Sequence, residues 1–182
     1  MWSEKDALSG VIAPVCDRYG VPYVATRGFP SITLLYDSAQ AMAATGKPAT
    51  VFYFGDHDAS GQCMSDGLEG KLRDVGADCD VQRVALNPEQ IDAFRLPTRP
   101  GKLTDSRQVE FAARFGGTSV ELDALPPDHL ASLVERSIAS AIERDAWRCV
   151  SEIEALEAET LESIALAGWV PGHRYAAPEA TP

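Results

Sequence analysis

The sequence predicts an α/β fold, a parallel sheet flanked by helices with a helical extension at the C-terminal end. Three observations carry this prediction. Strand-like and helical hydrophobic periods alternate through the first two-thirds of the chain. Residues 49–54 are almost continuously apolar, which is typical of a central parallel strand covered on both faces. The last third lacks strand patterns and predicts two helices, over about 126–143 and 145–167.

The first two-thirds of the chain provide strands and helices in the alternating order of a doubly wound sheet. Ser31 is a suitable N-cap for the second helix, and Asn87-Pro88 is a suitable start for a short one. In chain order we expect a helix over 8–19, a strand over 21–26, a helix from 31 to about 46, a strand over 49–54, a helix over 64–75, a strand over 79–86, a helix over 87–93, a loop over 96–107, a helix ending near 115 and an edge strand over 118–122.

Composition narrows the class of protein. The 182 residues carry a formal net charge of -11 and are 45% hydrophobic, which excludes wholesale disorder and suits one domain with a helical appendage. No apolar run is long enough for a membrane helix, and no signal peptide pattern opens the chain, so we expect a cytoplasmic protein without a membrane partner. Residues 1–119 hold 15 acidic and 12 basic residues, a net of -3, whereas residues 120–182 hold 12 and 4, a net of -8.

The strongest chemical signal is Asp56-His57-Asp58, directly after the buried strand and followed by Gly61. Alternate residues at a strand end can direct two carboxylates at one hard cation, and Mg²⁺ is typically held by one or two carboxylates plus waters and phosphate oxygens. Gly61 would let the backbone turn closely into the next helix. Alternation also predicts that His57 points away from the two acids. Without further context, helix caps and loop acids are the more common explanation of such a pair.

Glu4 is the second candidate. We expect it to open the first helix with Ser3 as its N-cap, where an acidic residue also suits the helix dipole. In a parallel sheet the carboxyl ends of neighbouring strands converge, so Glu4 and the Asp56/Asp58 pair could share one metal.

These motifs together resemble the Toprim domain family. Glu4, the loop Arg27-Gly-Phe-Pro-Ser31 and Asp56-x-Asp58-x-x-Gly61 occur in the order found in topoisomerase VI A subunits and meiotic double-strand-break proteins, with Arg27 in place of a Lys and Ala59 in place of a Pro. The resemblance covers about residues 1–86. It implies a Toprim-like (Rossmann-like) sheet in which Glu4, Asp56 and Asp58 bind Mg²⁺, with Mn²⁺ as an alternative, and are the catalytic residues. The later segments NPEQIDAFRLP, TDSR and VELDALPP resemble stretches that follow the Toprim core in phage and bacterial proteins.

Two departures from the family bear on function. Only three residues precede Glu4, where the family has a full central strand, so the chain is a fragment, has a misassigned start, or has a first strand that is nearly absent. The tyrosine-bearing winged helix that cuts DNA in topoisomerase VI A is also missing from the sequence. We therefore expect this chain to need a DNA-binding domain or partner subunit, and the sequence leaves open whether it is an enzyme by itself.

The resemblance implies a metal-dependent domain that acts on nucleic-acid phosphodiesters, with DNA as the expected nucleic acid, in a nuclease-like or topoisomerase-like reaction. The alternative is a non-catalytic Toprim-like interaction module of a phage or plasmid system. A receiver-like phosphoacceptor is disfavoured, because the acidic pair follows the third strand and the single acid the first. Candidate phosphate contacts are Arg27, Arg99, Lys102 and Arg107, for which scattered solubilising charge is the competing explanation.

The expected organisation is thus a metal-binding core with a truncated first strand, followed by accessory segments. The core covers 1–86, a basic loop with a helix and an edge strand covers 87–122, a helical pair covers 123–168, and a disordered tail covers 169–182.

Overall fold

The computed structural model describes residues 1–101 and 106–166, and it confirms the α/β class. Contacts divide the chain into two compact units, Met1–Ala141 and Ile142–Pro182. The centre of the first unit is a four-stranded parallel sheet of order β2-β1-β3-β4, made of β1 (Trp2–Ser3), β2 (Val24–Ala25), β3 (Ala49–Phe54) and β4 (Cys79–Ala85).

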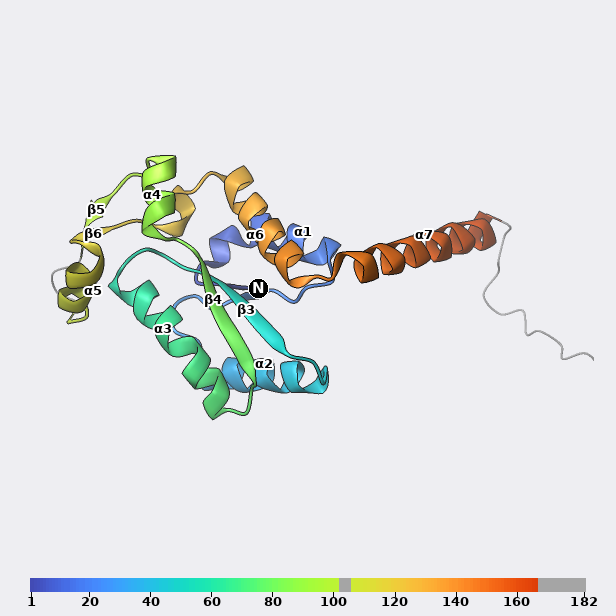
Figure 1. The fold of residues 1–182 in the computed structure, drawn as a ribbon, viewed down its shortest axis with the longest axis horizontal. Coiled ribbons are helices and arrows are strands. Elements are labelled where there is room, and N and C mark those ends of the chain that lie inside the picture. The colour runs from blue at the N-terminus through green and yellow to red at the C-terminus, as the bar shows by residue number, and fades with distance from the viewer. Residues whose placement is uncertain (102–105, 167–182) are drawn as a thin grey trace, which may run out of the picture. The chain divides into compact units, whose positions relative to one another are not determined.

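Helices cover both faces of this sheet (Figure 1). The helices α2 (Ile32–Ala44) and α3 (Ala59–Asp74) lie on one face, where Leu35, Leu68 and Leu72 pack with residues of β1 and β3. The helices α1 (Ser9–Arg18) and α6 (Pro127–Ala141) pack against each other on the opposite face. Burial on both faces explains the unbroken apolar run of β3, whose last four residues are buried.

The segment between β4 and α6 contains two short helices and two short strands. Its elements are α4 (Pro88–Phe94), β5 (Arg99–Pro100), α5 (Gln108–Phe115), β6 (Thr118–Ser119) and a 3₁₀ turn at Leu122–Ala124. The strands β5 and β6 pair with each other in an antiparallel ladder. The expected edge strand over 118–122 is therefore only two residues long. Val120 instead exchanges backbone hydrogen bonds of 2.8 and 3.0 Å with His57. These bonds connect the segment to the acidic loop, the residues 55–61 between β3 and the first turn of α3.

Local signals explain where the helices begin. The Ser31 side chain accepts a hydrogen bond from the Leu34 N–H at 3.2 Å, and Asn87 with Gln90 forms a capping box at α4. Both expected caps are confirmed.

The beginning of the first helix differs from the expectation. Ser3 lies in β1 rather than at an N-cap, and Glu4 follows that strand directly. A 3₁₀ turn at Asp6–Leu8 separates Glu4 from α1, so Glu4 does not open the helix. The short first strand nevertheless lies in the middle of the sheet, paired with β2 and β3. The expected strand over 21–26 is reduced to β2.

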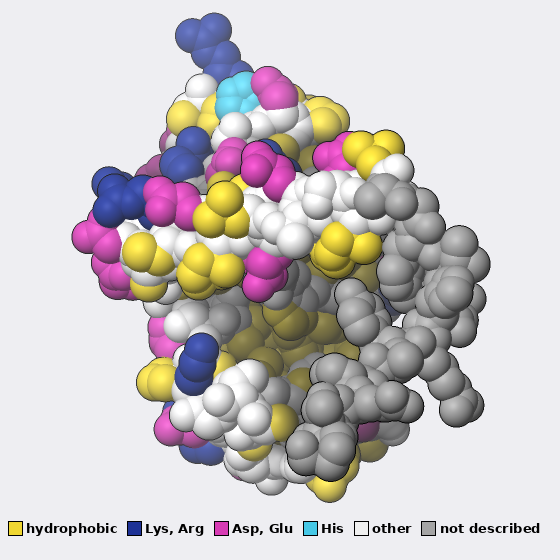
Figure 2. All heavy atoms as spheres, turned by 90° about the vertical axis from the view of Figure 1, so that its right-hand side faces the viewer, with side chains coloured by type: hydrophobic (Ala, Val, Ile, Leu, Met, Phe, Trp, Pro, Cys, Tyr) yellow, Lys and Arg dark blue, Asp and Glu magenta, His cyan; other side chains and the backbone are white. Residues whose placement is uncertain are grey.

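The second unit contains α7 (Arg144–Leu166). None of the residues described for this helix is buried, although one face carries large apolar side chains. Figure 2 shows hydrophobic and acidic side chains interspersed on the molecular face that it draws. The exposed apolar residues of the helix are Val150, Ile153, Leu156, Leu161, Ile164 and Leu166. In the described ranges, no helix is both long and apolar enough to cross a membrane.

Gly61, in the first turn of α3, gives a test of this packing. A Cβ atom there would lie 2.4 Å from the Asp56 carbonyl oxygen, whereas one at Gly67 would meet only the Lys71 Cε at 3.9 Å. We expect Gly61→Ala to lower the free energy of unfolding by about 2 kcal/mol, and Gly67→Ala to leave it unchanged or raise it by up to about 1 kcal/mol through helix propensity. Urea denaturation of both variants measures the difference, and equal effects would contradict the crowding at Gly61.

Candidate metal centre

Glu4 and Asp56 meet where β1 and β3 end. Ser3 pairs with Phe54 in the register of these parallel strands, so the residues that follow them emerge side by side. The Glu4 N–H donates a 2.9 Å hydrogen bond to the Phe54 carbonyl, and the Asp56 N–H donates one of 3.1 Å to Glu4 Oε2. The convergence that parallel pairing predicts is thus observed for these two residues.

Asp58 is the N-cap of α3. Its Oδ1 accepts a 2.7 Å hydrogen bond from the Gly61 N–H, and its backbone is extended, as an N-cap requires. The carboxylate is still close enough to Glu4 and Asp56 to raise the pKa of both. Asp58 therefore starts the helix and adds negative charge to the site at the same time.

His57, between the two acids, points elsewhere, as alternation predicts. Its ring is buried and packs edge-on against Phe111 and Phe115 of α5, with centroid distances of 5.1 and 5.4 Å. Burial, together with the charge of Arg83, holds its pKa below the usual value. His57 is thus an anchor for the loop rather than a partner of the acids.

Burial and neighbouring carboxylates shift the pKa values of Glu4 and Asp56. Burial first, and then the charge of Asp56, raises the pKa of Glu4 from 4.5 to about 7. Burial also raises the pKa of Asp56, against the opposing effects of the Leu122 N–H, which donates to Asp56 Oδ1 at 2.7 Å, and of Lys5. The charged form of Glu4 is therefore disfavoured near neutral pH, and a bound cation would offset that effect.

Lys5 forms ion pairs with this cluster, and no sequence pattern pointed to it. Its Nζ lies 3.3 Å from Asp56 Oδ1, 2.9 Å from Glu121 Oε2 and 3.3 Å from Asp123 Oδ1. Burial lowers the pKa of Lys5, but the hydrogen bond to Glu121 and the charge of Asp56 outweigh that effect and raise it. Glu121 and Asp123 thus share a lysine with the candidate centre.

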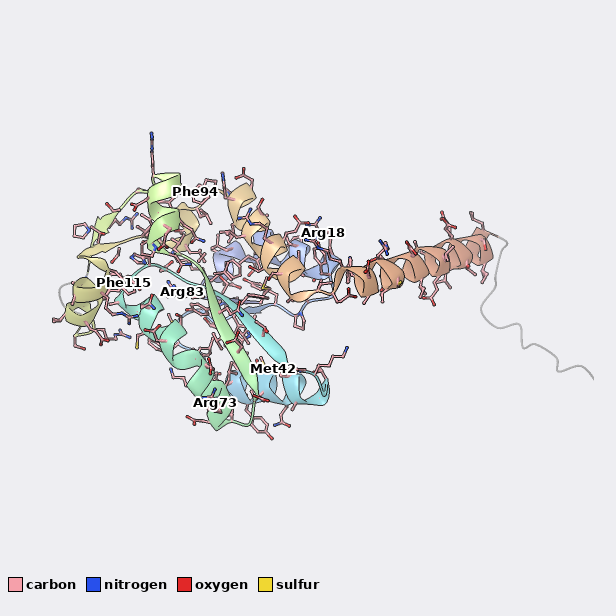
Figure 3. The ribbon with its side chains drawn as sticks, in the orientation of Figure 1. Arg18, Met42, Arg73, Arg83, Phe94 and Phe115 are labelled. Carbon is pink, nitrogen blue, oxygen red and sulfur yellow. The ribbon has the colours of Figure 1, made fainter. Side chains whose placement is uncertain are left out.

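Arg83 on β4 fixes the backbone of the acidic loop, and the sequence did not indicate it either. Its guanidinium donates to the carbonyl of Gly61 at 3.0 Å, of Gly55 at 3.2 Å and of Leu86 at 3.3 Å, and also to that of Asp56. Figure 3 labels Arg83 where β4 passes the beginning of α3. One largely buried cation therefore holds both ends of the loop that carries the two aspartates.

The residues around Glu4 leave no room for additional side-chain atoms. A Cβ atom on either Gly55 or Gly61 would lie 3.0 Å from Glu4 Oε2, and one on Gly55 would also lie 2.9 Å from the Tyr53 Oη. That hydroxyl is buried and accepts or donates no hydrogen bond within the described part of the chain. A buried polar atom without a partner indicates a site for a water or an ion. All-oxygen donors next to it suit Mg²⁺, so the residues present fit the predicted metal.

A narrow cleft of about 150 Å³ gives access to the two aspartates. Its lining includes Asp56, Asp58, Ser60, Arg99 and Glu121. Within residues 1–101 and 106–166, no three His, Cys, Asp or Glu side chains are placed to hold a metal by themselves. A cation here would therefore complete its coordination with waters or with phosphate oxygens, as Mg²⁺ commonly does.

The four predicted phosphate contacts lie in different places. Arg99 lines the cleft and donates to Glu121 at 2.7 Å, and Arg107 donates at 3.1 Å to Ser60, which also lines the cleft. Arg27 is exposed and pairs with Asp6 at 2.6 Å. Lys102 lies outside the described residues. The structure thus places Arg99 in the cleft with the two aspartates, links Arg107 to it through Ser60, and leaves Arg27 in a separate ion pair.

Neither models of known protein families nor curated proteins match this chain.

The role of Arg83 can be tested by Arg83→Met, which keeps the bulk of the side chain and removes every donor. We expect the free energy of unfolding to fall by about 3 kcal/mol, because several carbonyls lose a charged donor at once. Arg114→Met is the matched control, since Arg114 is exposed and forms one surface ion pair with Asp66, worth less than about 1 kcal/mol. Urea denaturation compares the two, and equal losses would rule out a central role for Arg83.

The raised pKa of Glu4 predicts how stability depends on pH. With a pKa of about 7 in the folded chain and near 4.5 when unfolded, Glu4 binds more protons in the folded state between these values. Stability should therefore fall as pH rises from 4.5 to about 7, and Glu4→Gln should abolish that part of the fall.

We expect Glu4→Gln to match the wild type near pH 4.5 and to be the more stable protein above about pH 7. Unfolding is followed in urea with a chelator present. Parallel pH profiles for the two proteins would contradict the assignment to Glu4.

Proposed function

We propose that this chain is a Toprim-like, Mg²⁺-dependent domain that acts on nucleic-acid phosphodiesters and works with a DNA-binding domain or partner subunit. The observation that carries the proposal is the direct contact of Glu4 with the Asp56 backbone at adjoining strand ends, with Asp58 beside them. Three carboxylates from two distant segments gather at the edge of the sheet where doubly wound folds bind ligands.

In this proposal Glu4, Asp56 and Asp58 would hold the metal together with waters or phosphate oxygens, and the metal would neutralise phosphodiester charge and stabilise the attacking or leaving oxygen. Arg83 holds the loop carbonyls in place, and Lys5 orients Asp56 through the ion pairs that it also forms with Glu121. Arg99, in the same cleft as the two aspartates, provides a cation for a phosphate oxygen. With a pKa of about 7, Glu4 can also hold or release a proton at Oε2 near neutral pH.

The distribution of charge is compatible with a nucleic-acid substrate. Of the net charge of -11, residues 120–182 contribute -8, and the segment with the candidate centre is nearly balanced. A divalent cation would offset two of the negative charges that crowd together at the strand ends. Few basic residues lie at the cleft, which supports the proposal that a partner domain or subunit provides most of the contacts to DNA.

A second candidate function is a non-catalytic Toprim-like interaction module. One observation favours it, because each of the three acids already has an internal partner. Glu4 accepts from the Asp56 N–H, Asp56 accepts from the Leu122 N–H, and Asp58 caps α3. In that case the motif is kept for the fold of the loop and not for metal.

The two candidates are separated by metal binding and DNA nicking in isosteric variants. Asp56→Asn, Asp58→Asn and Glu4→Gln keep an acceptor for each internal N–H while removing the charge. For a metal site we expect Mn²⁺ affinity, measured by calorimetry or by electron paramagnetic resonance, to fall at least about tenfold in each variant. Nicking of supercoiled DNA in Mg²⁺ should fall in parallel.

Asp66→Asn is the matched control, because Asp66 also lies on α3 but pairs with Arg114 away from the strand ends. It should bind Mn²⁺ as the wild type does. Equal Mn²⁺ binding by wild type and all three site variants would refute the metal centre and leave the interaction module. If the wild type binds Mn²⁺, the three variants do not, and the wild type does not nick DNA, the result would support a metal centre that needs a partner for catalysis.

A further inference from the structure

Phe29 lies at the surface with a cation on its ring from each of two helices. The side chain is 48% exposed. The Lys71 Nζ of α3 lies 4.9 Å from the ring centroid, and the Arg107 guanidinium, at the start of α5, lies 5.4 Å from it. Both distances are within the range of cation–π attraction. A single exposed aromatic side chain thus holds two positive charges near each other.

The loop before α2 is shaped to present this ring. Arg27 has φ 51° and Gly28 has φ 95°, both in the left-handed region, and Ser31 then caps α2. A left-handed pair turns the chain sharply, so Phe29 projects from the corner instead of joining the core. A left-handed conformation is energetically unfavourable for a residue other than glycine, so the surrounding contacts must hold Arg27 in place.

Lys71 is the cation of α3 that has no carboxylate partner. Among the described residues it forms no ion pair, whereas Arg73 pairs with Glu69 on the same helix. Its stem lies along the helix, since the Lys71 Cε is the atom nearest to a Cβ built on Gly67. A Cβ atom at Gly67 would lie 3.9 Å from that carbon, an ordinary van der Waals contact, so the position of the Lys71 stem does not depend on the glycine.

The other cation joins this surface to the acidic cleft. Arg107 donates to Ser60 Oγ, and Ser60 lines the cleft together with Asp56 and Asp58. Arg107 also borders a groove of about 330 Å³ between α3 and α5, in which Asp66 is already paired with Arg114. From the acids outward, the surface runs from Ser60 through Arg107 and Phe29 to Lys71.

We propose that Phe29, Lys71 and Arg107 form a phosphate clamp, which binds the sugar–phosphate backbone of a nucleic-acid strand beside the acidic cleft. The inference rests on the proposed function for its substrate and assigns Phe29 and Lys71 a role in binding. The ring positions the two cations so that adjacent backbone phosphates can bridge them. Because such contacts reach only the backbone, the clamp binds without regard to base sequence.

The test is binding of a fluorescein-labelled thymidine oligonucleotide of about 20 residues, followed by anisotropy in EDTA so that no divalent metal takes part. Lys71→Gln removes one phosphate contact, so affinity should fall about fivefold at ~0.1 M salt, and the slope of log affinity against log salt should fall by about 1. Phe29→Ala should weaken binding severalfold although no charge is lost, because the cations lose their support. Phe29→Leu, which keeps apolar bulk without a π-face, should weaken it too.

Two control variants are matched to these changes. Arg73→Gln removes a charge from the same last turn of α3, where Arg73 pairs with Glu69 instead of contacting Phe29, and Tyr36→Ala removes an aromatic ring that is 53% exposed on α2. Figure 3 labels Arg73 at that end of the helix. Both variants should bind as the wild type does. Wild-type affinity in Lys71→Gln or Phe29→Ala would overturn the clamp, as would an equal loss in Arg73→Gln or no binding by the wild type.

The outcome is independent of the metal centre, because the assay contains no divalent cation. If Asp56→Asn loses Mn²⁺ binding while the clamp variants bind the oligonucleotide as the wild type does, the proposed function is supported and the clamp is refuted. If the protein binds the oligonucleotide through Lys71 and Phe29 but has no Mn²⁺ site, the clamp is supported and the proposed function is refuted.

Discussion

The site depends most on one interaction, the burial of the Arg83 guanidinium among main-chain carbonyls. The loop from Gly55 to Gly61 leaves the sheet, carries both aspartates and enters α3. Arg83 donates to three of its carbonyls, those of Gly55, Asp56 and Gly61, and the Gly55 carbonyl also accepts from the Leu86 N–H at 2.8 Å. Hydrogen bonds from a charged donor contribute more than those from a neutral one, so this contact stabilises both ends of the loop. The same cation lies close enough to Glu4 to lower its pKa, against the effect of burial. Backbone geometry and charge at the strand ends are thus fixed by one side chain.

Asp56 and Glu4 differ in their nearest positive charge. Lys5 forms ion pairs with Asp56, Glu121 and Asp123, whereas Arg83 donates to the backbone and lowers the pKa of Glu4 only through its charge. Glu4 has no ion pair of its own among the described residues. Burial, followed by the charge of Asp56, therefore outweighs Arg83 and leaves the pKa of Glu4 at about 7. A bound cation would supply the ion pair that Glu4 lacks.

The sequence predicted those features that depend on local patterns and on parallel pairing. The apolar run of β3, the caps at Ser31 and Asn87 and the meeting of Glu4 with Asp56 all follow from periodicity or from strand order. Features that depend on contacts between distant segments could not be predicted. Lys5 and Arg83 carry no motif of their own, and their roles arise only when residues about 116 and 27 positions away are folded against them. Two-residue strands such as β1 and β2 are likewise set by their neighbours and not by their own propensity.

The positions of Glu121 and Asp123 show why the segment after β4 belongs to the site, although the family resemblance ends near residue 86. The Leu122 N–H donates to Asp56, the acids on either side of it hold Lys5, and Val120 pairs with His57. Each of these contacts acts on a residue of the acidic loop or on its neighbour Lys5. If this segment were detached, Asp56 would lose a hydrogen bond that lowers its pKa, and Lys5 would lose two of its three carboxylates. The smallest piece of this chain that could hold the candidate centre as described therefore extends beyond the sheet to at least the 3₁₀ turn at Leu122–Ala124.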